Sequence, residues 1–174
     1  MSKTTTIDYN TTLKYSGYGA LLSFVVMILL LVSGNSPWSS ASWMGCWIPG
    51  VTAYFVLKIY HQNNSVVSYG NSLRRSMMVI FFQALFYTLA AIIFSLVVNT
   101  GAVDLYQTEM MANAAQLQTM MGEEMFTQLA KELENLSFST LAFWDFIYKL
   151  IGGFIVSLIL ASIFRKNNPI FENE

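Results

Sequence analysis

Long stretches without charge divide the chain. No Asp, Glu, Lys or Arg occurs within residues 15–57, 76–103 or 150–164. A bilayer core about 30 Å thick needs roughly 20 apolar residues of helix to cross it. The first stretch has room for two spans, the second for one, and the third for most of a fourth. The pattern therefore predicts an all-α membrane protein with four transmembrane helices.

Helix-breaking residues set the expected limits of these spans. Gly34 and Pro37 end the first span, because both residue types interrupt helices. Pro49 lies inside the second span and predicts a kink, since proline removes a helix hydrogen bond. The expected spans are 15–32, 43–60, 76–98 and 140–164. A cleaved signal peptide over residues 1–42 is disfavoured, because its apolar stretch exceeds the usual length.

The distribution of basic residues predicts the orientation. Of the nine Lys and Arg residues, all but Lys131 and Lys149 fall on one side of the predicted bilayer. The side richer in Lys and Arg is normally cytoplasmic, so both termini are expected there. The residues on that side are Lys3, Lys14, Lys58, Arg74, Arg75, Arg165 and Lys166. The expected segments are a cytoplasmic tail (1–14), spans one to three (15–98), a periplasmic arm (99–139), span four (140–164) and a second cytoplasmic tail (165–174).

The periplasmic arm reads as two amphipathic helices between spans three and four. Asp104, with Gln107 three residues later, predicts the cap of the first helix. Gly122 interrupts the pattern, and Glu123 suits the positive end of a second helix dipole. Apolar residues recur on one helical face. That face packs, rests on the membrane or docks a partner. The candidate docking residues are Met110, Leu117, Met121, Phe126, Leu129 and Leu133.

Three polar residues within the spans are candidates for function, because ionisable groups in a membrane are costly. Asp145 and Lys149 are four residues apart and can pair on one helix face. The interpretations are a structural pair near the outer boundary or an ion or substrate role. Gln83 suits an interhelical hydrogen bond of about 1 kcal/mol, and a polar wall of a permeation path is the alternative.

Small residues spaced by four mark one face of the fourth span. Gly153, Ser157 and Ala161 fall on this face. Small residues at this spacing let two helix backbones approach closely. The pattern predicts a helix-packing face without identifying the helix that packs against it.

The amino-acid composition excludes several classes of function. The chain is 55% apolar and 11% charged, with a net charge of −1, one Cys and one His. This balance excludes a nucleic-acid footprint, and the Cys and His counts exclude a Cys-rich or multi-His metal centre. Cys46 is expected as a small buried apolar residue. No catalytic motif occurs, so neither an enzyme nor a cofactor is expected.

Two functions remain open. An accessory or scaffold subunit of a membrane complex, docking through its arm, is the favoured interpretation. A small oligomeric transporter or channel is the alternative, because four short spans enclose little space. The expected partners are the lipid bilayer and either another membrane protein or further copies of this chain.

The layout resembles a family of small four-span membrane proteins of Bacteroidota, domain-of-unknown-function family 4199. The matching segments are 14–17 at the start of span one, 68–73 before span three, the acidic Met- and Glu-rich stretch 109–134, and 161–171 at the end of span four. Asn71 and Ser72 depart from the Lys and Ala usual in the second segment. The resemblance implies a bacterial inner membrane and carries no catalytic residue over.

Overall fold

The computed structural model describes residues 9–39, 42–64, 66–98 and 101–165, and the regular elements among them are helices. The predicted tails lie mostly outside these residues, as do Lys3 and Lys166. The helices are α1 (Tyr9–Val32), α2 (Trp43–Cys46), α3 (Ile48–Asn63), α4 (Tyr69–Val97), α5 (Ala102–Ala112), α6 (Ala114–Met121), α7 (Glu123–Glu134) and α8 (Phe138–Ile163).

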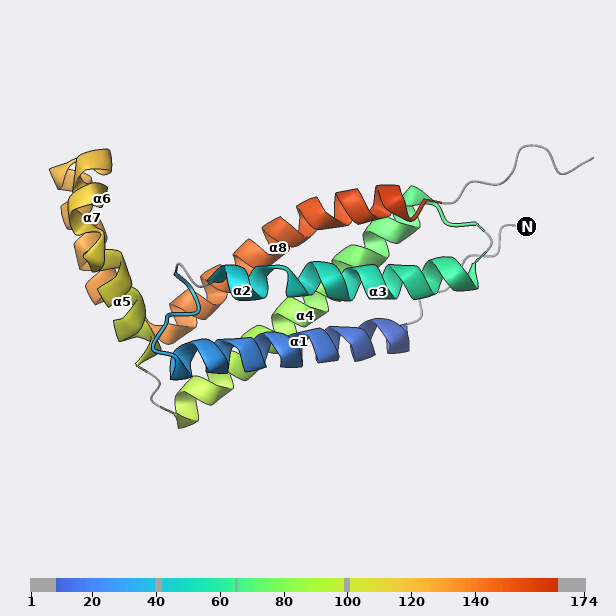
Figure 1. Cartoon of the computed structure of the whole chain (residues 1–174), viewed down its shortest axis with the longest axis horizontal. Coiled ribbons are helices and arrows are strands. Elements are labelled where there is room, and N and C mark those ends of the chain that lie inside the picture. Colours follow the sequence, from blue (N-terminus) through green and yellow to red (C-terminus); the bar gives the residue numbers. More distant parts are fainter. Residues whose placement is uncertain (1–8, 40–41, 65, 99–100, 166–174) are drawn as a thin grey trace, which may run out of the picture.

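Four of these helices form an up-and-down bundle. α1, α3, α4 and α8 alternate in direction, and α4 crosses the other three (Figure 1). α1 begins and α8 ends at one end of the bundle, whereas α5, α6 and α7 project from the opposite end (Figure 1). The start of α1 and the end of α8 therefore share one side, and the arm occupies the other.

Three helices are long and apolar enough to cross a membrane within the described part of the chain: α1, α4 and α8. Their outer surfaces stay apolar. Leu29 is 59% exposed, Leu96 80% and Ile159 56%. Large exposed apolar surfaces mark contact with lipid or another protein. The chain is thus an all-α, multi-pass membrane protein.

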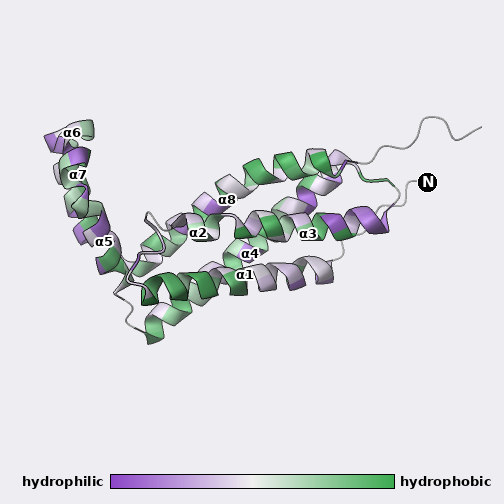
Figure 2. Ribbon diagram, in the orientation of Figure 1, coloured by the Kyte–Doolittle hydropathy of each residue, from purple (hydrophilic) through white to green (hydrophobic). Residues whose placement is uncertain are grey.

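The second predicted span is divided. The expected kink at Pro49 is a complete break: α2 ends at Cys46, and α3 begins at Ile48 with Pro49 in its first turn. Proline has no N–H to donate to the preceding turn, and an early position in a helix tolerates that loss. α3 also ends in polar residues, visible at its right-hand end in Figure 2. At 16 residues, α3 is shorter than the other long helices.

Serine caps begin two of the long helices. The Ser68 hydroxyl accepts the Asn71 N–H at the start of α4, and the Ser137 hydroxyl accepts the Thr140 N–H before α8. Each hydroxyl satisfies a backbone donor that the first turn leaves unpaired. Span three therefore starts earlier than predicted, at Tyr69, because the cap lies at Ser68.

The arm differs from its prediction in two places. Its predicted first helix is broken at Asn113, so the arm has three helices. The side-chain amide of Asn113 donates to the Glu109 carbonyl at this break. Gly101, at φ 59°, caps α5, and Asp104 lies in its first turn. The prediction that Asp104 is the cap was wrong, because Gly101 adopts the left-handed backbone that starts the helix earlier. α7 begins at Glu123 after Gly122, at φ 85°.

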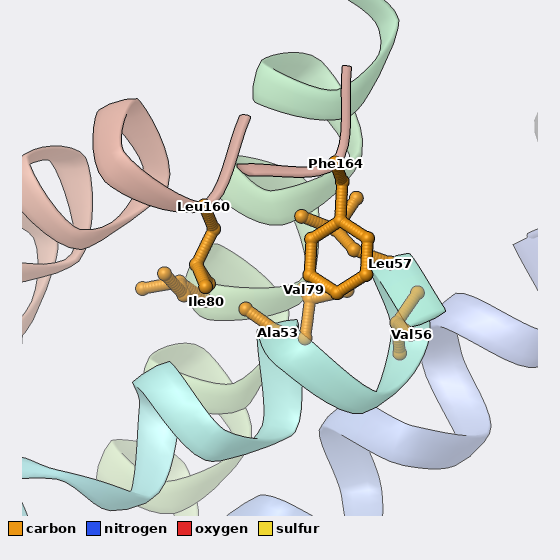
Figure 3. Packing of buried hydrophobic residues seen from close by; sticks show 7 residues of the cluster. All are labelled: Ala53, Val56, Leu57, Val79, Ile80, Leu160 and Phe164. Carbon is orange, nitrogen blue, oxygen red and sulfur yellow. The ribbon is translucent and has the colours of Figure 1, made fainter. Parts of the chain in front are cut away.

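An apolar cluster closes the end of the bundle away from the arm. It joins α3, α4 and α8 and consists of Ala53, Val56, Leu57, Val79, Ile80, Leu160 and Phe164 (Figure 3). A second cluster joins α1 and α4 around Met27 and Tyr87. Between the arm and the first cluster the helices leave an open space.

Candidate functional site

A cavity of about 550 Å³ lies where the arm meets the bundle. This volume falls within the range typical of small-molecule sites. Its apolar walls come from Val26, Met27 and Leu30 of α1, Leu129 and Leu133 of α7, and Val156 of α8. The cavity thus combines residues from the membrane bundle with residues from the arm.

The floor of the cavity is closed. A β-carbon on Gly50 would lie 3.2 Å from Val156 Cγ1, so α3 and α8 touch there. A β-carbon on Gly153 would lie 2.4 Å from Ile80 Cγ2, so α4 and α8 also touch. Ile80 belongs to the apolar cluster of Figure 3. The cavity is therefore bounded toward the far end of the bundle by packed side chains.

Asp145 and Lys149 form an ion pair in this cavity. The Lys149 ammonium donates to the Asp145 carboxylate, and the side chain of Lys149 is only 15% exposed and that of Asp145 17%. The ammonium also lies 4.2 Å from the centre of the Tyr87 ring, a cation–π contact across to α4. The Tyr87 side chain also lies beside the Asp145 carboxylate. Tyr87 of α4 therefore lies against both members of the pair.

Sequence reasoning missed Tyr87. The spacing of four residues on one helix places Asp145 and Lys149 together, but Tyr87 lies 58 positions before Asp145. Its place beside the pair depends on the register in which α4 packs against α8. No local pattern specifies that register.

Aromatic side chains with polar atoms line the cavity near the arm. Trp38 packs edge-to-face on Phe138, with ring centres 4.9 Å apart. Its indole nitrogen is buried and has no hydrogen-bond partner among the residues that the structure describes. Burial, and secondarily the nearby Tyr148, raise the pKa of the Tyr106 hydroxyl. Burial thus favours the neutral form of this hydroxyl.

Cys46 also lines the cavity, and its thiol donates to the Trp43 carbonyl at 3.2 Å. The side chain is exposed, so the prediction of a buried Cys46 was wrong. Cys46 is the last residue of α2, a short helix in which none of the four residues is buried.

Gln83 lies outside the cavity lining. It is 1% exposed between α1 and α4, and its amide nitrogen is 3.4 Å from the Ser23 hydroxyl. A β-carbon on Gly19 would lie 2.5 Å from the Gln83 amide and 2.6 Å from Thr52 Oγ1. Because Gly19 has no side chain, polar groups of α1, α3 and α4 can meet beside it. Gln83 therefore forms a polar contact between helices.

The small residues of span four face α4. Gly153, Ser157 and Ala161 are all buried. The Ser157 and Ser76 hydroxyls are 2.8 Å apart, which joins α8 to α4 by a hydrogen bond. The helix that packs against this face, which the spacing left open, is α4.

The six candidate docking residues lie mainly inside the arm. They are Met110, Leu117, Met121, Phe126, Leu129 and Leu133, all half-buried or buried. α6 and α7 contact each other, and Leu129 and Leu133 line the cavity. The methionines exposed on the arm are others: Met111 at 44%, Met120 at 76% and Met125 at 60%.

Polar contacts hold the base of the arm to the bundle. The Glu109 carboxylate accepts the Ser36 N–H at 2.8 Å and the Ser39 hydroxyl. The Gln107 amide donates to the Leu133 carbonyl and so joins α5 to α7. No group of three or more His, Cys, Asp or Glu side chains able to hold a metal ion occurs in the described ranges.

Comparison with known proteins identifies a family and no activity. No curated protein and no solved structure matches the chain. One family matches residues 14–166, which include nearly all of the bundle, the arm and every residue that lines the cavity. The chain belongs to the family of proteins of unknown function DUF4199.

Proposed function

We propose that this protein is an accessory or scaffold subunit of a complex in the bacterial inner membrane and that its arm docks a partner. The supporting observation is the shape of the arm, which extends away from the bundle (Figure 1) and exposes Met120 and Met125 near the turn between α6 and α7. Flexible, polarizable methionine side chains suit a surface that adapts to another protein.

Purification in mild detergent tests this proposal. The double variant Met120→Ser, Met125→Ser is expected to lose a stoichiometric heterologous partner that the parent chain retains. Gln118→Ser with Gln128→Ser is the matched control, because both glutamines are exposed on the same helices. A homogeneous assembly of this chain alone, unchanged by the methionine substitutions, would contradict the scaffold role.

The same proposal includes four membrane spans. The second of them consists of two helices, α2 and α3. α3 runs through the bundle and contacts α1, α4 and α8. Seven of the nine basic residues then fall on the side of the chain termini, which supports cytoplasmic termini and a periplasmic arm.

Cysteine labelling tests the topology. Single cysteines at Asn10, Gln118 and Asn173, each in a Cys46→Ser background, are expected to react differently with an impermeant maleimide on intact cells. Only position 118 should be labelled before lysis, and all three should be labelled afterwards. Labelling at position 10 or 173 of intact cells would reverse the orientation.

A transporter is the second candidate, and the Asp145–Lys149 pair favours it. Ion pairs inside transmembrane bundles often lie on ion or substrate paths. Against it stands the closed floor formed by Gly50, Val156 and Ile80. Transport would therefore require a second conformation that opens this floor.

A further inference from the structure

The charges that line the cavity do not balance. Among the described residues of the lining, the acids are Glu132 and Asp145, and Lys149 is the one basic residue. Lys149 is already paired with Asp145. Glu132 is exposed, and no ion pair to it occurs within the part of the chain that the structure describes. The cavity therefore keeps one net negative charge, on a carboxylate that a ligand can reach.

Accessible aromatic rings line the same cavity. Trp144 and Tyr148 of α8 are 50% and 66% exposed, and their rings stack with centres 6.1 Å apart. The half-buried Tyr106 of α5 also lines this space. The face of an aromatic ring attracts a cation through the ring quadrupole. An uncompensated carboxylate and open aromatic faces thus occur together, and both favour a positively charged ligand.

The rest of the accessible wall is apolar. Val26 of α1 and Leu129 and Leu136 of the arm are half-buried, so part of each side chain remains open to the cavity. Gly45 and Gly152 line the cavity without filling it. A volume of about 550 Å³ is far larger than a simple inorganic ion needs. The lining therefore matches a cation that carries an apolar body.

We propose that this cavity binds an amphiphilic organic cation, in which an ammonium or similar group is attached to an apolar body. The positive group is held by the Glu132 carboxylate and the exposed rings of Trp144 and Tyr148. The apolar body lies along Leu129 and Val26. An anionic ligand would be repelled by the same carboxylate, and an uncharged one would gain nothing from it. The inference concerns the cavity alone and is independent of whether the arm docks a partner.

Photolabelling with matched head groups tests the charge of the ligand. The full-length protein in phosphatidylcholine nanodiscs is irradiated with dodecyltrimethylammonium that carries a diazirine on its chain, and labelled peptides are mapped by mass spectrometry. The competitors dodecyltrimethylammonium, dodecanol and dodecyl phosphate share one chain and differ in head-group charge. Labelling is expected on residues 129–136 or 144–152, which contribute to the lining. The cation should suppress it at about fivefold lower concentration than the alcohol or the phosphate. Equal or stronger competition by either of these two, or absence of labelling on both segments, overturns the proposal.

A fourth competitor identifies the source of the cation. Tetraphenylphosphonium carries its charge on a compact aromatic body, whereas dodecyltrimethylammonium resembles a lipid-like amine. Competition by both cations assigns the cavity to lipophilic cations in general, and competition by dodecyltrimethylammonium alone assigns it to lipid-like amines. Either result supports the proposal, and failure of both cations to compete overturns it.

Two glutamates of α7 provide a matched pair of variants. Glu132 lines the cavity, Glu134 does not, and both are exposed. Glu132→Gln and Glu134→Gln each remove one negative charge from the arm and so lower any general attraction of cations equally. Glu132→Gln should raise the concentration of dodecyltrimethylammonium needed for competition about fivefold, the upper range for an exposed ion pair. Glu134→Gln should leave it unchanged. Equal competition curves for the two variants overturn the proposal.

Two glycines separate binding in the cavity from adsorption on the surface. Gly152 lines the cavity, Gly17 does not, and a β-carbon on either residue would meet no atom within 4 Å. Gly152→Leu is therefore expected to fold and to reduce labelling about tenfold by occupying part of the cavity, whereas Gly17→Leu should label like the parent. Equal labelling of the two variants would contradict a ligand in this cavity, and the melting temperature of each variant reports whether it folds.

Discussion

Gly153→Leu is expected to destabilise the bundle by about 3 kcal/mol, the upper range for inserting bulk into a packed core. A β-carbon at this position would already lie 2.4 Å from Ile80 Cγ2. Ile80 is held between α3 and α8 within the apolar cluster, so it has little room to move. The remaining leucine atoms would force α8 away from α4. Thermal or denaturant unfolding in detergent measures the loss.

Two controls isolate the packing effect. Gly152→Leu makes the same chemical change one residue earlier, where a β-carbon meets no atom within 4 Å. Ile155→Leu alters a side chain that is 56% exposed on the opposite face. Both variants should stay within about 0.5 kcal/mol of the parent or gain slightly. If Gly153→Leu has the same melting temperature as these two controls, the close contact between α4 and α8 is refuted.

Removing one member of the Asp145–Lys149 pair is expected to cost about 3 kcal/mol, because the other charge stays buried without its partner. Lys149→Gln leaves the Asp145 carboxylate without its ammonium partner. Asp145→Asn leaves the ammonium over the Tyr87 ring. The double variant removes both charges and should be no less stable than either single variant.

Stability and cellular function must be measured together on these three variants. A double-mutant cycle from unfolding data gives the coupling energy of the pair. Strictly additive losses would show that the two charges do not compensate each other. A double variant that is stable and correctly inserted, yet fails to complement a deletion strain, would show that the charges carry function and would favour the transporter.

The parts of the fold that local sequence determines were predictable. Charge-free stretches of sufficient length predict α1, α4 and α8, and spacing on one helix predicts the contact of Asp145 with Lys149. Such features need only the helix period and the thickness of the bilayer. These features do not depend on contacts with distant parts of the chain.

The parts that depend on contacts between distant segments were not predictable. The cavity exists because Glu109 holds α5 against Ser36 and because Leu133 of α7 reaches the bundle. Tyr87 meets the ion pair only through the register of α4 against α8. The cap at Gly101 likewise overrides the favourable pattern at Asp104, since the backbone conformation before α5 sets where the helix begins.

The central position of α4 has a consequence for biogenesis. α4 contacts α1, α3 and α8 and supplies Gln83, Ser76 and Ile80 to the contacts among them. Helices of a membrane protein insert first and associate afterwards. α1 and α3 leave the ribosome before α4, so the polar groups near Gly19 lack Gln83 until α4 has been synthesised. α8 follows only after the arm, and its docking onto Ile80 is the step that completes the bundle and closes the floor beneath the cavity. A nascent chain that stops before α4 would present these polar groups to lipid and to membrane quality control.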